Sequence, residues 1–255
     1  MNGFEQHGID HVSASSLNTY AAEPALWVME RLLKKRGPVG CAAYRGRAIE
    51  HGVSLGLFAP EMEVEACQDS ALKEYDRETA LNGDHNRQKE RDAIPGAVEI
   101  ALAELRQYGV PDRPNNERQH KVSIDLEGVA VPCIGFTDFE YPQHGMLIEL
   151  KTQLRLASSI SVAHARQVSV YQAAKGNWQA RVAYVTPKKV GVYVLEQEQC
   201  REGINSLTQT AIRLERFLRL SKDPEELAGL VVPNYDHFFW SSPVSRALGR
   251  ETFGM

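Results

Sequence analysis

The spacing of hydrophobic residues changes once along this chain, near Pro114. Before that point, apolar positions recur at intervals of three and four residues, which predicts amphipathic helices. Ser13 or Ser15 is expected to cap the first helix, because a serine hydroxyl accepts hydrogen bonds from free backbone N–H groups. Further helices are predicted at 24–36, 44–57, 63–82 and 95–108, with a charged surface connection at 82–91.

After Pro114 the chain is rich in valine and isoleucine, which favour strands. Two strands are predicted at 119–126 and 129–139, joined by a hairpin turn at Glu127-Gly128, and a third at Met146–Lys151. The remaining expected elements are a helix at 162–176, strands at 180–186 and 190–195, an amphipathic helix at 197–220 and an irregular, aromatic tail at 231–255. This order predicts one mixed α/β domain with a helical N-terminal elaboration.

Composition and charge restrict the class of protein. The 255 residues include 29 basic and 33 acidic side chains, for a net charge of −4. Proteins that coat nucleic acid usually carry a basic excess, so any contact with DNA would come from local basic patches or through a divalent metal. No uncharged apolar stretch approaches the roughly 18–20 residues of a membrane helix, and the N-terminus lacks a secretion signal. We therefore expect no membrane contact and a cytoplasmic location.

The candidate chemistry lies at the ends of two predicted strands. Asp138 closes the segment IGFTD, and Glu149 and Lys151 close the segment LIELK. Alternation along a strand places Glu149 and Lys151 on one face and turns the Leu150 side chain into the core. Two carboxylates and the Leu150 carbonyl form an all-oxygen ligand set suited to Mg²⁺ or Mn²⁺, and a lysine beside them can orient water or offset phosphate charge. The plain alternative is a solvated strand face with a weak ion pair.

Three further features of the sequence accompany the predicted group of Asp138, Glu149 and Lys151. His51 lies on a predicted helix upstream, and imidazole can bind Mn²⁺, although a structural histidine is the simpler interpretation. Gln167 and Tyr171 are one turn apart on the helix that follows the strand, where a half-buried seam is the alternative. The third feature is the segment SASSLNTY near the start of the chain. The alternative interpretation of this segment is a helix start rich in capping residues.

Taken in this order, the segments SASSLNTY, GRAIEHG, GFTDF, IELKT and QVSVY resemble the RecB-like branch of the PD-(D/E)xK nuclease superfamily, over about residues 12–195. The resemblance implies a restriction-endonuclease-like core of order αβββαβ with a mixed central sheet. It also implies His51, Asp138 and Glu149, with the Leu150 carbonyl, as ligands of one or two Mg²⁺ or Mn²⁺ ions, and Lys151 as the catalytic lysine. Gln167 and Tyr171 would position the site and the DNA.

On this basis, a single nuclease domain is expected over residues 1–255. Its expected parts are a helical N-terminal part at 12–110, a catalytic core at 118–195 joined by the helix 41–58, and a C-terminal helix and tail at 196–255. Some members of this branch bind an iron–sulfur cluster through closely spaced cysteines. Here the cysteines are scattered singly, so we expect buried thiols and no iron–sulfur cluster. The cysteines are Cys41, Cys67, Cys133 and Cys200.

The expected activity is a DNase that degrades linear single- or double-stranded DNA, an exonuclease of recombination, repair or phage DNA metabolism. Arg45, Arg47 and Arg166 are the expected phosphate contacts, because they lie beside proposed site residues. A recombination or helicase partner and a homo-oligomer are compatible with this function. The alternatives are a non-catalytic DNA-binding or assembly module on the same fold and a site-specific endonuclease.

Overall fold

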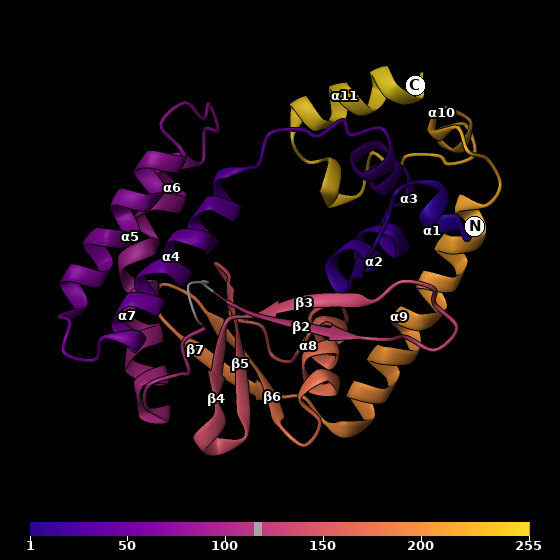
Figure 1. The fold of residues 1–255 in the computed structure, drawn as a ribbon. Coiled ribbons are helices and arrows are strands. Elements are labelled where there is room, and N and C mark those ends of the chain that lie inside the picture. The colour runs from indigo at the N-terminus through magenta and orange to yellow at the C-terminus, as the bar shows by residue number, and fades with distance from the viewer. Residues whose placement is uncertain (115–118, 255) are drawn as a thin grey trace.

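The protein is a mixed α/β structure in which helices surround two small sheets (Figure 1). The computed structural model describes residues 1–114 and 119–254. The first part of the chain is helical apart from one short strand, as the hydrophobic spacing predicts. Its elements are α1 (Gly3–Gln6), β1 (Val12–Ser13), α2 (Ala14–Ala22), α3 (Pro24–Trp27), a π-helical turn (Val28–Leu32), α4 (Cys41–Phe58), α5 (Val64–Glu78), α6 (Arg87–Asp92), α7 (Ile94–Leu105) and a 3₁₀ turn (Arg106–Tyr108).

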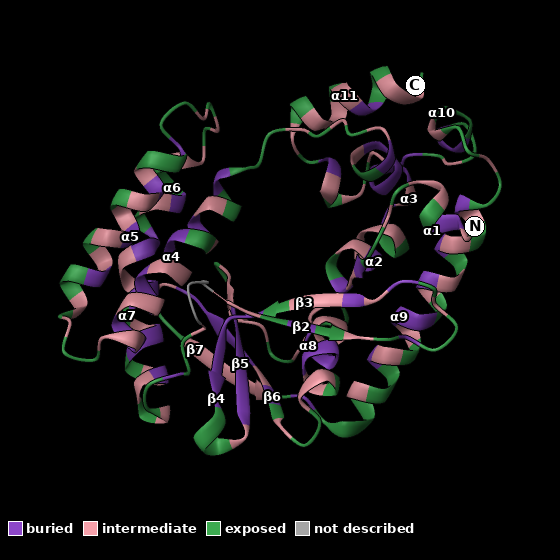
Figure 2. Ribbon diagram, viewed as in Figure 1, coloured by how far each residue is buried: buried purple, intermediate pink, exposed green. Residues whose placement is uncertain are grey.

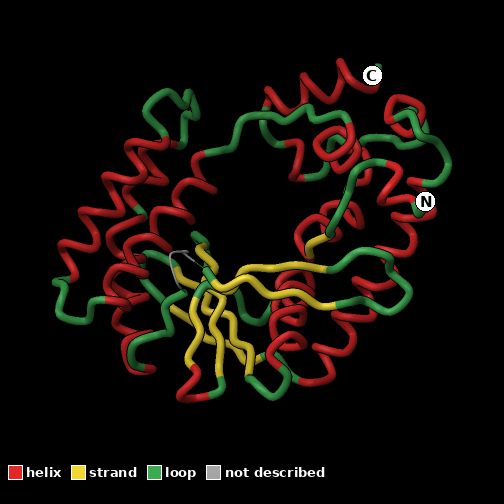
Figure 3. Tube along the Cα trace, in the orientation of Figure 1, coloured by secondary structure: helices red, strands yellow, loops and turns green. Residues whose placement is uncertain are grey.

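The second part supplies most of the strands and two long helices. In chain order these are β2 (His120–Ile124), β3 (Cys133–Thr137), β4 (Phe139–Tyr141), a 3₁₀ turn (Pro142–His144), β5 (Met146–Thr152), α8 (Val162–Lys175), β6 (Gln179–Val185), β7 (Val190–Val194) and α9 (Gln197–Leu218). A C-terminal segment then adds α10 (Pro224–Ala228), a 3₁₀ turn (Phe238–Trp240) and α11 (Pro243–Phe253). Figure 3 shows how the strands gather at the centre while helices occupy both sides.

The strands divide into a three-stranded sheet of order β1-β3-β2 and a four-stranded sheet of order β4-β5-β6-β7. Both sheets are mixed: β1 runs parallel to β3 and β5 parallel to β6, whereas the other neighbours are antiparallel. The sequence predicts an uninterrupted strand at 129–139. The structure breaks it at Asp138, so that β3 joins one sheet and β4 the other. The predicted three-strand meander is therefore split between two sheets.

Two hydrophobic cores cover opposite faces of the four-stranded sheet (Figure 2). Alternation along β5 places Leu147 in the core formed with α8 and α9, and Ile148 and Leu150 in the core formed with α4, α5 and α7. Glu149 shares the face of Leu147, toward α8. On the other side, Gly52 lets α4 approach α5 closely, because an added Cβ there would lie 2.9 Å from the Ala71 Cβ.

Several predicted boundaries differ from the structure for identifiable reasons. The helix from Pro24 ends at Leu32, because Lys34 adopts a positive φ of 57°. The helix predicted at 44–57 begins at Cys41, whose backbone N–H donates to Asp84 Oδ2 at 3.0 Å. The charged connection at 82–91 contains α6.

The prediction of an irregular tail was wrong, because the tail contains α11. That helix begins at Pro243, and proline is well tolerated in a first helical turn. The Ser242 hydroxyl caps the helix by accepting a hydrogen bond from the N–H of Ser245. Trp240 is fully buried against Ala25 and Met29, whereas Phe238 is 69% exposed. Tyr235, Phe239 and Leu248 pack against the same cluster, and the Asn234 N–H donates to Glu23 Oε1 at 3.1 Å, so the tail is fixed to the N-terminal helices.

Candidate active site

The break between β3 and β4 places Asp138 beside Glu149. In the β4–β5 pairing Phe139 lies opposite Ile148, so one step further along the same register Asp138 faces Glu149. The backbone N–H of Leu150 donates to Asp138 Oδ2 at 2.8 Å. Asp138 is 8% exposed and Glu149 is 3% exposed. The two carboxyl groups expected from the sequence are thus brought together at a buried hairpin end.

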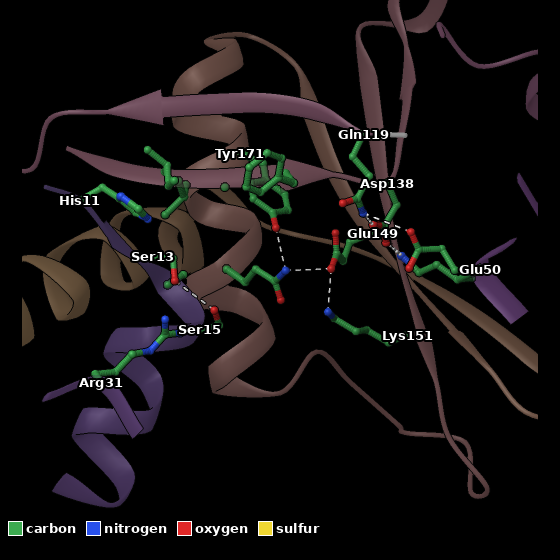
Figure 4. A pocket seen from close by; sticks show the side chains of 17 residues that line it. His11, Ser13, Ser15, Arg31, Glu50, Gln119, Asp138, Glu149, Lys151 and Tyr171 are labelled. Carbon is green, nitrogen blue, oxygen red and sulfur yellow. Dashed lines mark hydrogen bonds and ion pairs between the residues drawn. The ribbon is translucent and has the colours of Figure 1, made fainter. Parts of the chain in front are cut away.

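Glu149 is the centre of a hydrogen-bonded group that joins β5 to α8 (Figure 4). Its Oε1 accepts from Lys151 Nζ at 2.6 Å and from Gln167 Nε2 at 2.8 Å. Gln167 Nε2 also lies 2.6 Å from the Tyr171 hydroxyl, to which it donates. Glu149 Oε2, in contrast, is buried without a hydrogen-bond partner among the described residues. The structure therefore brings Lys151, Gln167 and Tyr171 to one carboxylate and leaves its second oxygen available.

A close approach between β3 and α8 positions Tyr171. A Cβ added to Gly135 would lie 2.4 Å from Tyr171 Cε1, which no real contact permits. Glycine at 135 therefore allows the tyrosine ring to lie against β3 with its hydroxyl directed at Gln167.

Glu50, rather than His51, reaches this group from α4. Gln119, which directly precedes β2, donates from Nε2 to Asp138 Oδ1 at 2.5 Å and to Glu50 Oε1 at 3.2 Å. His51 instead has its Nε2 3.0 Å from Ser70 Oγ on α5 and does not line the pocket. Neighbouring residues of a helix point about 100° apart, so only one of the two can face the sheet. The structure does not bring His51 to the carboxylates.

The three predicted phosphate-binding arginines all lie outside the pocket lining that the described residues form. Arg45 is buried, forms an ion pair with Glu90 and donates to the Thr152 carbonyl at 3.4 Å. Arg47 lies over the Tyr44 ring, 3.8 Å from Glu78. Arg166 donates to Asn18 Oδ1 at 3.2 Å. Arg45 and Arg166 are thus occupied in holding elements together, and the Arg47 side chain is 56% exposed.

A cavity of about 420 Å³ adjoins the carboxylates and has walls of different character. Glu50, Asp138 and Glu149 line one end. The other wall carries polar and basic side chains from the N-terminal segments (Figure 4), together with residues of β3. The polar and basic side chains of that wall are His11, Ser13, Ser15 and Arg31. The cavity therefore joins an acidic end to a wall able to receive anionic groups.

Crowding of acids dominates the electrostatics of the site. Burial, and then the charges of Glu149 and Glu50, raise the pKa of Asp138 well above its usual value. Burial lowers the pKa of Lys151, but the neighbouring acids, Glu149 first, outweigh it and the net shift is upward. Lys151 is therefore charged at neutral pH. Among the described residues, Glu50, Asp138, Glu149 and Lys151 line this end of the cavity, and a cation bound there would meet carboxyl oxygens.

The donor types fit a hard divalent ion. Among residues 1–114 and 119–254, no three acidic, histidine or cysteine side chains already form a group that could hold a metal. Gln119 lies between Glu50 and Asp138, and Lys151 occupies Glu149 Oε1. The buried, unpartnered Glu149 Oε2 is the kind of oxygen that Mg²⁺ or Mn²⁺ would satisfy. The cysteines form no part of this site; all four are free thiols.

Neither a protein-family model nor a curated protein matches this sequence. Within the described residues, no helix is both long and apolar enough to cross a bilayer.

Sequence reasoning missed Glu50 and Gln119. The one signal for Glu50 in the sequence is its place next to His51, on a helix predicted to contribute to the site. Gln119 carries no comparable signal, because its partners lie 19 and 69 residues away.

Proposed function

We propose that this protein is a Mg²⁺- or Mn²⁺-dependent DNA nuclease, and specifically an exonuclease of DNA recombination, repair or phage DNA metabolism that works in the cytoplasm. The observation that carries the proposal is the meeting of Asp138, Glu149 and Lys151 in one buried corner of the cavity, with Glu149 Oε2 unpartnered. After α4 and the three helices α5 to α7, the order β2, β3, β4, β5, α8 and β6 supports a restriction-endonuclease-like core.

In this function Asp138, Glu149 and Glu50 would hold the metal together with the Leu150 carbonyl. When bound, such an ion acidifies water and stabilises negative charge on a phosphoryl group. Lys151 contributes a fixed positive charge next to the ligands, where it can hold a water molecule or a phosphate oxygen. Gln167 keeps Glu149 in place through its side-chain amide, and Tyr171 in turn keeps Gln167 in place.

The opposite wall of the cavity would hold the DNA backbone. Arg31 and the serine hydroxyls of the α2 start offer positive charge and hydrogen-bond donors, which suit phosphates without reading sequence. In this proposal the wall has the role that the sequence assigned to Arg45, Arg47 and Arg166.

Incubation of the purified protein with end-labelled linear DNA and Mg²⁺ or Mn²⁺ tests the proposal. The wild-type protein should degrade the DNA, and Asp138→Asn and Lys151→Ala should each lower the rate about 100- to 1,000-fold, as expected for groups that stabilise the transition state. Lys222→Ala, at an exposed lysine, is the matched control. Undiminished activity in either site variant would show that the site is assigned wrongly.

A non-catalytic DNA-binding module is the second candidate, favoured by the lack of a preformed metal group among the described residues. DNA binding without cleavage, and with no Mn²⁺-induced thermal shift, would support it. Discrete fragments from a circular plasmid would instead indicate a site-specific endonuclease.

A further inference from the structure

Gln119 bridges two acidic side chains that belong to different parts of the fold. Its Nε2 lies 2.5 Å from Asp138 Oδ1 and 3.2 Å from Glu50 Oε1 (Figure 4). Asp138 stands at the break between β3 and β4, and Glu50 stands on α4. A single neutral amide nitrogen thus connects α4 to the hairpin end.

The position of that nitrogen is the position that a cation would need. Carboxylate oxygens bind Mg²⁺ and Mn²⁺ at about 2.0–2.2 Å, so an ion shared by Glu50 and Asp138 would lie between the same two oxygens. The other oxygen of Asp138 already accepts the Leu150 N–H. An amide hydrogen supplies only a partial positive charge, which is less than a cation would bring to Asp138 Oδ1.

Glu149, the third acid of this cluster, has different hydrogen-bond partners. Glu149 Oε1 is held by Lys151 and Gln167, while Oε2 is buried and has no partner among the described residues. One ligand oxygen is thus open, and another, Asp138 Oδ1, is covered by Gln119. Metal entry would require a change at Gln119 and none at Glu149.

We propose that Gln119 holds the place of the cation in the metal-free protein and leaves it when the metal binds. This inference rests on the proposed metal-dependent function. On this view Gln119 fills the space between Glu50 and Asp138 in the metal-free protein. Its hydrogen bonds to both acids also compete with the cation, so they lower metal affinity.

Isothermal titration of Mn²⁺ into the full-length protein at neutral pH, without DNA, tests this inference. Gln119→Leu keeps the side-chain volume and removes the donor. The Kd for Mn²⁺ should then fall about tenfold, the effect expected from losing a hydrogen bond to a charged group. Gln119→Ala should act in the same direction and serves if the leucine variant does not fold. The control is Gln143→Ala, because the exposed Gln143 amide also donates to two oxygens, the carbonyls of Tyr108 and Val110.

The outcomes separate this inference from the proposed function. Tighter Mn²⁺ binding by both Gln119 variants, with Gln143→Ala unchanged, supports the inference. An unchanged Kd overturns it, and so does a raised Kd, which would make the Gln119 carbonyl a ligand. In either case the proposed function stands if the wild-type protein binds Mn²⁺ and cleaves DNA. If the wild-type protein does not bind Mn²⁺ at all, both proposals fail.

Discussion

At the scale of single residues, the site is defined by how each carboxyl oxygen is used. Asp138 accepts one backbone and one side-chain N–H, and Glu149 gives one oxygen to Lys151 and Gln167 while the other has no partner among the described residues. A buried carboxylate oxygen without a donor raises the energy of the ionised form. In the metal-free site the ionised carboxylates are therefore destabilised, and a bound cation would stabilise them.

Asp138 should make the metal-free protein less stable as pH rises. Its folded-state pKa lies above the unfolded value of about 3.9, so the folded protein binds more protons between these two values and loses stability as pH increases through that window. Asp138→Asn cannot ionise. At neutral pH in EDTA it should raise Tm by about 2–4 °C, the shift produced by 1 kcal/mol in a chain of this size.

Differential scanning calorimetry between acid and neutral pH measures this effect. The Tm difference between Asp138→Asn and the wild-type protein should shrink toward low pH, where Asp138 is protonated in both states. Asp125→Asn, at an exposed aspartate, serves as the control. A variant that is less stable than the wild-type protein at neutral pH would contradict the electrostatic argument.

At the scale of elements, the site depends on the contact between β3 and α8. Gly135 lets Tyr171 pack against the strand, Tyr171 receives the Gln167 amide, and Gln167 holds Glu149 on β5. Three elements are thus linked through one glycine, one hydroxyl and one amide. A shift of α8 by the width of a methyl group would therefore also displace the Glu149 carboxylate.

Gly135→Ala should therefore reduce both stability and activity. The added methyl group forces Tyr171 away from β3, at a cost of about 1–3 kcal/mol for overpacking. Displacement of Gln167 and Glu149 should slow DNA cleavage by about 10–100-fold, since a misplacement near 1 Å has effects of that size. Initial rates with labelled DNA and thermal melts measure the two effects. Gly83→Ala, where nothing lies within 4 Å of the added Cβ, should change neither; a wild-type rate in Gly135→Ala would disprove the linkage.

At the scale of the whole molecule, the proposed function requires a protein of net negative charge to bind DNA, which is a polyanion. The net charge is −4, and three carboxyl groups line the end of the cavity where cleavage is proposed. These charges repel phosphates unless a divalent ion neutralises them. Arg31 on the opposite wall offsets part of this repulsion. The metal would therefore serve binding as well as catalysis.

The DNA affinity of the Lys151→Ala variant, in which cleavage is expected to be slow, should accordingly depend on the metal. Fluorescence anisotropy with a labelled duplex should give a Kd at least about tenfold lower in Mn²⁺ than in EDTA, a difference of about 1.4 kcal/mol. A Kd that is equal in the two buffers would show that the carboxylates do not oppose DNA binding, and it would weaken the placement of the backbone in this cavity.

Local pattern alone was sufficient for most elements and for part of the site. The period of apolar residues located α5, α7, α8 and α9 to within a few residues, because burial of one face dictates that period. Alternation along β5 placed Glu149 and Lys151 together and turned Leu150 into the core, since a strand has a fixed period of two.

Tertiary structure decided the rest. The rotation of α4 about its axis directs His51 to Ser70 and Glu50 to the sheet. The identities of adjacent residues in the sequence do not reveal that rotation. The split of one predicted strand at Asp138 depends on which sheet each half can join. Gln119 meets its partners across 19 and 69 residues. Sequence periodicity reports which face of an element is buried, but only packing between distant elements determines which side chains meet.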